Sequence, residues 1–290
     1  MRPPQRWEPE TGALHHPFMR FCVRTIGILA ATGMMVMPVF SQLPPPTDSP
    51  AGVPAQAPPV QSPPAFERPV SWKLMLPNLL SDQERIWTFP ARLVKGQNWV
   101  PAAATLGATA GFIAFDPTEA AYFHQTTTFH GFNNILSGNA TAIGTLMAPV
   151  SLYAIGLVRH DTKMEGTALL AGEAAADAEI VTLALKEGTR RLRPSGVQPG
   201  GNYSDTWYDG SGSLFQGHGS FPSGHTIAAF SIATVVARRY RNHRWVPYTA
   251  YGMAMLVGFS RLSLSAHFLS DVFMGGALGY SISRFAVLRQ

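Results

Sequence analysis

From about residue 71 onward, long apolar stretches alternate with short polar ones, and none shows the sustained apolar–polar alternation of a strand. We therefore predict an all-α fold, a bundle of about six helices with the active site at helix ends. Ser81-Asp82-Gln83-Glu84 predicts one helix start, with an N-cap followed by an acidic first turn. The expected helices cover residues 81–90, 99–115, 135–158, 163–186, 223–238, 245–260 and 266–284.

The composition of these helices leaves open whether they lie in a lipid bilayer. Residues 135–158 carry no charge and are long enough to span one, and residues 245–260 almost reach that length. Gly, Ala, Ser and Thr dilute both stretches, and a helix buried on all sides in a soluble bundle has the same composition. The sequence is compatible with a membrane-embedded bundle and with a soluble one.

Residues 1–41 have the organisation of an export signal. Two arginines precede the uncharged stretch 25–42, and Val39 and Ser41 occupy the small-residue positions of a cleavage site after Ser41. A start at Met19 would give a signal of ordinary length, and an uncleaved membrane anchor is the alternative. We expect an exported protein, periplasmic or membrane-associated, with its active site on the non-cytoplasmic side.

Residues 42–70 differ in composition from both neighbouring segments. Ten of the 24 prolines lie between Leu43 and Val70, among Ala, Gln and Ser. Such a segment neither forms a helix nor buries a core. We predict a disordered linker at 42–70, followed by one folded helical domain at 71–290.

The charge and the cysteine content limit the classes of substrate and partner that the protein can bind. Charged residues make up only 13% of the chain and hydrophobic residues 46%, a low charge density for a soluble protein. The net charge of +5 comes without a basic tract interleaved with aromatics, so we expect an anionic substrate or membrane surface and no nucleic acid. Cys22 is the only cysteine, which excludes an intrachain disulfide and a thiolate metal cluster.

The segment from Ser260 to Asp271 contains the strongest candidate chemistry. His267 and Asp271 are four residues apart, which would place them on one face of a helix, and Arg261 lies six residues before the histidine. A carboxylate fixes the tautomer and orientation of an imidazole nucleophile, and a guanidinium binds two phosphoryl oxygens at once. The spacing alone is also that of an ordinary polar helix face.

Two upstream segments add cations and a second histidine. Lys186 and Arg193 are seven residues apart at the end of a predicted helix and could hold a phosphoryl group together. Between them, we interpret Arg190 and Arg191 as basic residues that complement the helix dipole.

The other segment is Pro222-Ser223-Gly224-His225. Ser223 is a candidate helix cap, Gly224 lets the backbone approach an anion, and His225 is placed to donate a proton to a leaving oxygen.

In chain order, Lys-x6-Arg-Pro, Pro-Ser-Gly-His and Ser-Arg-x5-His-x3-Asp resemble the signature of the type 2 phosphatidic acid phosphatase and vanadium haloperoxidase superfamily. The resemblance covers about residues 163–284, and the spacers between the motifs are also similar to those of the family. The matching positions are Lys186, Arg193, Pro194, Pro222, Ser223, Gly224, His225, Ser260, Arg261, His267 and Asp271.

The resemblance implies a role for each matching side chain. His267 would become a phosphohistidine, Asp271 would orient it, and His225 would protonate the leaving oxygen and then activate water. The phosphate-binding group would consist of Lys186, Arg193, Ser223, Gly224 and Arg261. No metal ion or cofactor is expected.

We therefore expect an exported, metal-independent acid-type phosphatase that hydrolyses phosphomonoesters or diphosphates. A phosphorylated lipid is the expected substrate, with membrane association, because the apolar helices resemble those of the membrane-associated family members. One alternative is a vanadium-dependent haloperoxidase, which would hold vanadate in the same residues. The others are a soluble non-specific acid phosphatase acting on small phosphoesters and a catalytically silent binding module.

Overall fold

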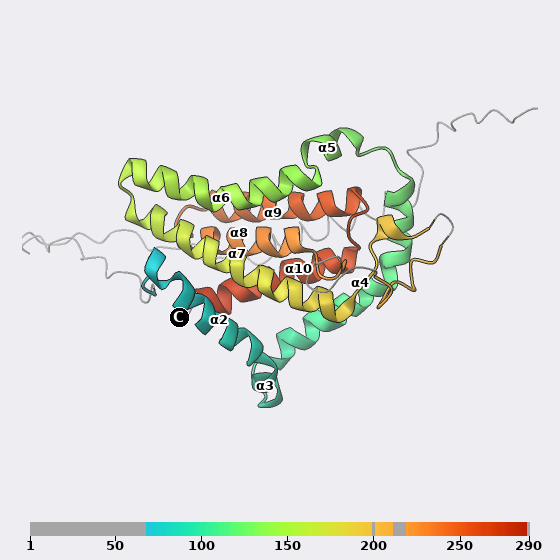
Figure 1. Cartoon of the computed structure of the whole chain (residues 1–290), viewed down its shortest axis with the longest axis horizontal. Helices are drawn as coiled ribbons and strands as arrows, with labels where there is room; N and C mark the ends of the chain where they lie inside the picture. The colour runs from blue at the N-terminus through green and yellow to red at the C-terminus, as the bar shows by residue number, and fades with distance from the viewer. Residues whose placement is uncertain (1–67, 199–200, 211–218, 289–290) are drawn as a thin grey trace, which may run out of the picture. The chain divides into compact units, whose positions relative to one another are not determined.

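The structure is a computed structural model that describes residues 68–198, 201–210 and 219–288. The predicted signal at 1–41 and most of the predicted linker lie outside the described residues, so those predictions stay open. The described part is helical and contains no strand, which confirms the all-α prediction (Figure 1). Its α-helices are α2 (Met75–Trp87), α3 (Phe89–Val94), α4 (Trp99–Gln125), α5 (His130–Ile135), α6 (Gly138–Arg159), α7 (Thr162–Thr189), α8 (Gly224–Arg239), α9 (Trp245–Ser263) and α10 (Leu269–Ser281).

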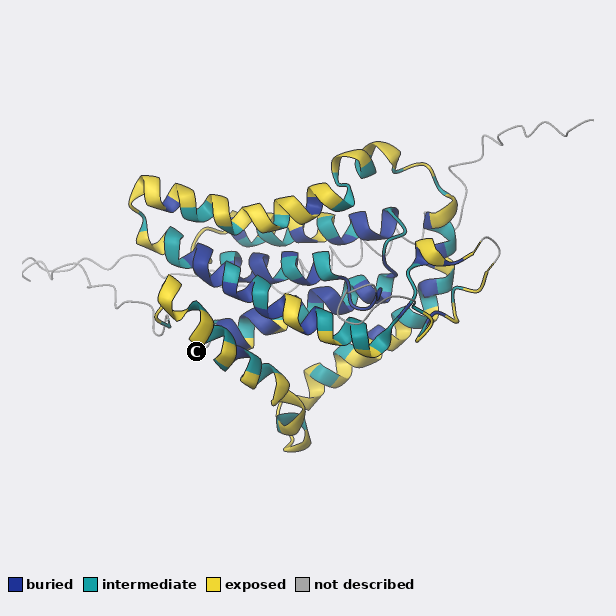
Figure 2. Cartoon of the chain, viewed as in Figure 1, coloured by how far each residue is buried: buried dark blue, intermediate teal, exposed yellow. Residues whose placement is uncertain are grey.

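Helix α8 is the centre of the bundle. It packs against α7, α9 and α10, while α6 lies along α7, and α4 packs against α10 (Figure 1). The core between α7 and α8 is built from small and β-branched side chains, among them Ala174, Ala178, Ile227 and Val235, all fully buried. Buried residues concentrate on these inner helices (Figure 2). Small side chains let the helix backbones approach closely.

Two glycines bring α10 directly onto the backbone of α8. A Cβ at Gly275 would lie 2.9 Å from the carbonyl oxygen of Ser223, and one at Gly279 would clash with the carbonyl oxygen of Ile227. At the start of both helices, the Ser223 amide donates to the Asp271 carbonyl at 3.1 Å. The close approach therefore fixes the beginning of α10 beside the beginning of α8, where two predicted motifs lie.

Helix α2 begins six residues before the predicted N-cap at Ser81. Asp82 is not in a first turn but in the middle of α2, fully buried, where it accepts hydrogen bonds from Arg68 at 2.6 and 2.8 Å. Arg68 also forms an ion pair with Glu173 of α7. Asp82 thus forms a tertiary contact with the segment before α2. The predicted helix start at Ser81 was therefore wrong.

Helix α4 continues ten residues beyond its predicted end at 115, through Pro117. The extension carries Asp116, which accepts from the Ser270 amide at 3.0 Å, and Glu119, which accepts from the Leu269 amide at 3.3 Å. These first amides of α10 have no acceptor within their own helix. The buried carboxylates of α4 therefore cap α10, and that contact favours the longer helix.

The outward face of α6 is apolar and exposed. By length and composition, α6 is the one described helix that could cross a membrane, and only 11% of its most apolar 18 residues are buried. Large apolar side chains also point outward from α9, where Met253, Met255 and Leu256 are exposed. These faces have no protein partner among the described residues to cover them.

The α8–α10 contact gives a stability prediction. Gly279→Ala should lower the free energy of unfolding by about 1–3 kcal/mol, because the added methyl group would be forced against the α8 backbone. Gly252→Ala in α9 is the matched control: nothing lies within 4 Å of its Cβ, so the change should be neutral or stabilising by up to about 1 kcal/mol. Thermal unfolding in detergent measures both, and equal effects would contradict the close packing.

Candidate active site

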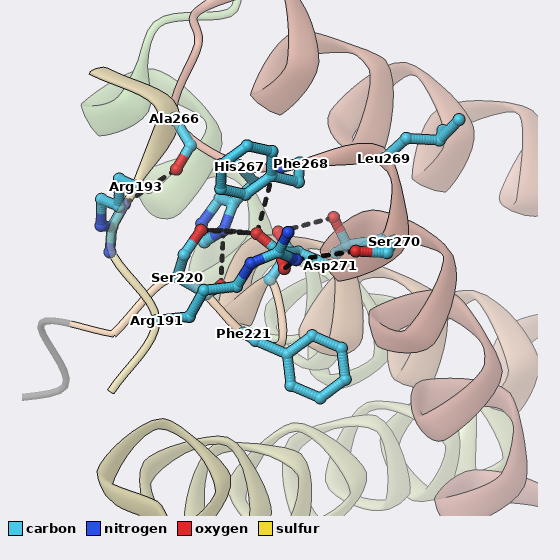
Figure 3. A network of polar contacts seen from close by, with 12 residues as sticks. Arg191, Arg193, Ser220, Phe221, Ala266, His267, Phe268, Leu269, Ser270 and Asp271 are labelled. Atoms are coloured by element: carbon cyan, nitrogen blue, oxygen red, sulfur yellow. Dashed lines mark hydrogen bonds and ion pairs between the residues drawn. The ribbon is translucent and has the colours of Figure 1, made fainter. Parts of the chain in front are cut away.

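The three sequence motifs meet at one end of the bundle. Helix α7 ends there, α8 begins there, and the loop from α9 to α10 turns there (Figure 1). The loop after α7 is tied to the other two segments by backbone hydrogen bonds, from Ser195 to Ser265 at 2.9 Å and from Ser220 to Arg191 at 2.7 Å. Residues up to 80 positions apart are therefore neighbours (Figure 3).

His267 lies in the loop before α10, and Asp271 lies in the first turn of that helix. The prediction that the two share a helix face was wrong, because the helix begins only at Leu269. They nevertheless face each other, with His267 Nδ1 3.5 Å from Asp271 Oδ2. The Phe268 amide donates to the same carboxylate oxygen at 2.9 Å, so that Asp271 also caps the start of α10.

The surroundings of His267 select one tautomer. Nδ1 lies 2.8 Å from the Ser220 carbonyl oxygen, which can only accept, so Nδ1 carries the hydrogen. Nε2 therefore keeps its lone pair, as a nucleophile requires. Burial lowers the pKa of His267 to about 4, although the neighbouring Asp271 acts in the opposite direction. The ring is neutral at physiological pH.

His225 is in the first turn of α8, and its Nε2 lies 3.1 Å from the carbonyl oxygen of Gly138 at the start of α6. This contact makes Nε2 the donor and leaves Nδ1 as the nitrogen that can exchange a proton with a ligand. Ser223 is at the N-cap position, but its side chain makes no capping bond; it accepts from Thr226 at 2.9 Å instead. The predicted side-chain cap is wrong, while the position is right.

Three cations surround the histidines. A Cβ at Gly224 would lie 3.7 Å from Lys186 Nζ, which places the ammonium against the start of α8. Arg193 contacts the Ala266 carbonyl at 3.5 Å, next to His267. Both charges and that of Arg261 act on His225. A neutral imidazole among fixed cations is suited to an anionic group.

Arg261 is almost fully buried and is held by neutral acceptors. Its Nη2 donates to the Leu136 carbonyl at 3.0 Å and to Ser260 Oγ at 2.8 Å. Leu136 belongs to the junction between α5 and α6, two residues before the carbonyl that His225 contacts. The junction therefore contacts both a predicted phosphate-binding residue and the predicted proton donor.

Four buried residues of the site were missed in the sequence. Arg191 donates to Asp271 Oδ1 and to Asp116 Oδ2, both at 2.7 Å, and so does more than complement the helix dipole, the role we predicted for it. Ser220 donates to Asp271, while Ser270 accepts from Arg191 and donates to Asp116. A carboxylate directly after the uncharged apolar stretch 99–115 is a recognisable signal for Asp116. For the serines we find no such signal.

In the described part of the chain, no group of three His, Cys, Asp or Glu side chains is arranged to hold a metal ion.

The sequence profile of the PAP2 superfamily matches residues 166–290. These residues are therefore similar to the PAP2 superfamily. The match includes all three motifs and confirms the predicted family.

Two relatives from Porphyromonas gingivalis are similar to short parts of the chain. One is a lipid A 1-phosphatase, 39% identical over 61 residues, which is 21% of this chain and 14% of the relative. The other is a lipid A 4'-phosphatase, 33% identical over 95 residues, which is 33% of this chain and 38% of the relative. The matches thus span less than half of either relative.

A solved structure, of a transmembrane PAP2-type phosphatidylglycerolphosphate phosphatase from Bacillus subtilis, is also similar. It is 21% identical to this chain with a TM-score of 0.43, and the match covers 73% of this chain and 92% of that one.

The neutral His267 ring leads to a pH prediction. In ¹⁵N-histidine-labelled protein, the ring of His267 should stay neutral down to about pH 4. An ordinary histidine binds its proton near 6.5, so the unfolded chain takes up this proton first. His267 therefore lowers the free energy of unfolding as the pH falls from 6.5 toward 4. The signal is assigned by its loss in His267→Gln, and titration near 6.5 would contradict the prediction.

Proposed function

We propose that this PAP2 protein is a phosphatase that removes phosphate from a phosphorylated lipid through a phosphohistidine at His267. The observation that carries the proposal is the convergence of two histidines and three cations at one end of the bundle. The match of residues 166–290 to the PAP2 superfamily supports the same reaction class. The short matches to two lipid A phosphatases favour a lipid substrate.

In the proposed first step, Nε2 of His267 attacks phosphorus, and the bond between phosphorus and the leaving oxygen breaks. The leaving oxygen takes a proton from Nδ1 of His225, which binds that proton from solvent once the negative charge of the bound phosphoryl group offsets the neighbouring cations. Asp271 stabilises the positive charge that forms on the His267 ring. Lys186, Arg193 and Arg261 hold the equatorial oxygens, together with Ser223 and the Gly224 amide, as charge redistributes over them.

In the second step, His225 accepts a proton from a water molecule that attacks the phosphohistidine. The bond between phosphorus and Nε2 breaks, inorganic phosphate leaves, and His267 returns to its neutral form. The fixed cations of the site take the part that magnesium has in other phosphotransfer enzymes, so we propose that neither a metal ion nor another cofactor is required.

We further propose that the bundle lies in a membrane. The support is the uncharged, exposed surface of α6 and the apolar side chains that point outward from α9, which water would solvate poorly. A lipid substrate would then reach the site from the bilayer. The PAP2 relatives whose names refer to lipid phosphates are compatible with this arrangement.

The end of the bundle opposite the site carries a cluster of arginines, three of them exposed, which indicates an orientation. The end opposite the site, where α8 turns into α9, carries Arg238, Arg239, Arg241 and Arg244 within seven residues. Short cytoplasmic loops are rich in Lys and Arg. We therefore propose that this end is cytoplasmic and that the site faces the other side, in an exported setting.

Replacement of His267 tests the reaction. His267→Ala should lower phosphate release by at least about 10³-fold, because the nucleophile is lost. The full chain in detergent is assayed without added metal on lipid A phosphates, phosphatidylglycerol phosphate, phosphatidic acid, an isoprenoid diphosphate and p-nitrophenyl phosphate. The matched control is His243→Ala, an exposed histidine at the opposite end, which should keep wild-type rates.

Retained activity in His267→Ala would overturn the proposed mechanism. Vanadate-dependent bromide oxidation without phosphate release would identify a haloperoxidase instead. Preference for p-nitrophenyl phosphate over every lipid would favour the soluble acid phosphatase.

Labelling of single cysteines tests the orientation. In a Cys22→Ala background, Asn242→Cys should be protected from a membrane-impermeant maleimide in intact cells, and Ser204→Cys should react. Both positions are exposed polar residues, one at each end of the bundle. Labelling of both in intact cells would exclude the membrane-spanning arrangement, and the reverse pattern would invert the orientation.

A further inference from the structure

Arg191 is the most deeply buried cation of the site, although it occupies one of the unspecified positions of the first motif. Its side chain is 1% exposed, and its guanidinium lies 4.0 Å from the ring centre of Phe268 and 4.4 Å from that of Trp207. Nε donates to Thr206 Oγ1 at 3.2 Å. Aromatic faces and a hydroxyl thus fix the plane of the guanidinium.

The remaining donors of Arg191 point at the carboxylate behind the nucleophile. Nη1 donates to Asp271 Oδ1 at 2.7 Å, while the other carboxylate oxygen faces His267 Nδ1 (Figure 3). Oδ2 also accepts from Ser220 Oγ at 2.5 Å. Asp271 therefore stands between two partners, with the guanidinium on one oxygen and the imidazole on the other.

A second carboxylate anchors the guanidinium from α4. Nη2 of Arg191 donates to Asp116 Oδ2 at 2.7 Å, and the same oxygen accepts from Ser270 Oγ at 2.5 Å. Ser270 Oγ in turn accepts from Arg191 Nη1 at 2.8 Å. The side chains of Arg191, Asp116 and Ser270 form a closed ring of hydrogen bonds, and Asp271 is joined to this ring through Arg191, so that α4 is linked to the first turn of α10.

An arginine suits this position better than a lysine, because it must bind the two carboxylates of Asp116 and Asp271 together. Two buried carboxylates close to one another repel unless a cation lies between them, and removal of one member of such a group leaves a buried charge without compensation. A guanidinium offers donors in a fixed plane, so it can bind both carboxylates at defined angles. A lysine offers a single point charge and leaves the angle of Asp271 less well defined.

We propose that Arg191 is a positioning residue for the phosphatase reaction: through Asp271 it sets the orientation of the His267 ring, with Asp116 as its counter-anchor. The inference rests on the proposed function, because it assigns a reactive role to His267. Arg191 itself does not touch the substrate. Its loss should thus lower the rate of phosphoryl transfer while substrate binding stays nearly unchanged.

The chain offers a matched control for this arginine. Arg68 also forms ion pairs with two buried carboxylates, Asp82 and Glu173, and links α2 to α7. It lies in the segment before α2 and makes none of the contacts described for the catalytic end. Arg68→Gln therefore reports the effect of breaking a buried arginine–carboxylate network on stability alone.

The kinetic arm uses the full chain in detergent with p-nitrophenyl phosphate. Arg191→Gln should lower kcat by about 10²-fold with KM within threefold, as expected for a misplaced nucleophile, and Arg191→Lys should recover part of the loss. Arg68→Gln should keep kcat within threefold at equal amounts of folded protein. In an Asp271→Asn background, Arg191→Gln should have little further effect, because the two residues act as one unit.

The spectroscopic arm does not depend on activity. In ¹⁵N-histidine-labelled protein, the ring nitrogens of His267 should report a single Nδ1–H tautomer in the wild type and in Arg68→Gln, and a mixture in Arg191→Gln. If the wild type releases no phosphate, the proposed function fails, and this spectrum alone decides the positioning role.

The proposal is overturned if Arg191→Gln keeps both the single tautomer and wild-type kcat. It is equally overturned if the loss of kcat adds in full to that of Asp271→Asn, or if it matches the loss in Arg68→Gln.

Discussion

The arrangement of the candidate active site depends on the hydrogen bonds and the ion pair that the buried Asp271 carboxylate forms. It accepts from the Phe268 amide, from Ser220 Oγ and from Arg191, and it faces the ring of His267. These groups come from the loop after α7, from the segment before α8 and from the junction of α9 with α10. A single anion therefore holds three distant parts of the chain in register, and its charge is compensated only when all of them are in place.

The helix packing provides the frame for this anion. Because Gly275 and Gly279 let α10 lie on the backbone of α8, the two helices begin at the same level, and His225 and Asp271 lie at neighbouring helix starts. The apolar outer surfaces of α6 and α9 contribute nothing to the polar network. The packing of the core thus determines the geometry of the site, while the apolar outer surface can interact with the surroundings of the protein without changing that geometry.

The motifs could be predicted from the sequence because their residues are defined by type and spacing within short segments. Lys186, Arg193, His225, Arg261, His267 and Asp271 are indeed brought together at one end of a helical bundle. Failures arose where a residue's role depends on a distant partner. Arg191 resembled a basic helix end, yet its partners are 75 and 80 positions away. Asp82 resembled an acidic residue in the first turn of a helix, yet it binds Arg68. Local patterns do not contain such pairings.

The junction of α5 and α6 connects the outer surface to the chemistry. The carbonyls of Leu136 and Gly138 bind Arg261 and His225, and the second of them is the first residue of the exposed apolar helix. A shift of α6 along its axis would displace both acceptors together. In the proposed reaction, proton transfer and the contacts to the phosphoryl oxygens are thereby coupled to the position of α6. In the proposed membrane setting, the thickness of the bilayer acts on that position.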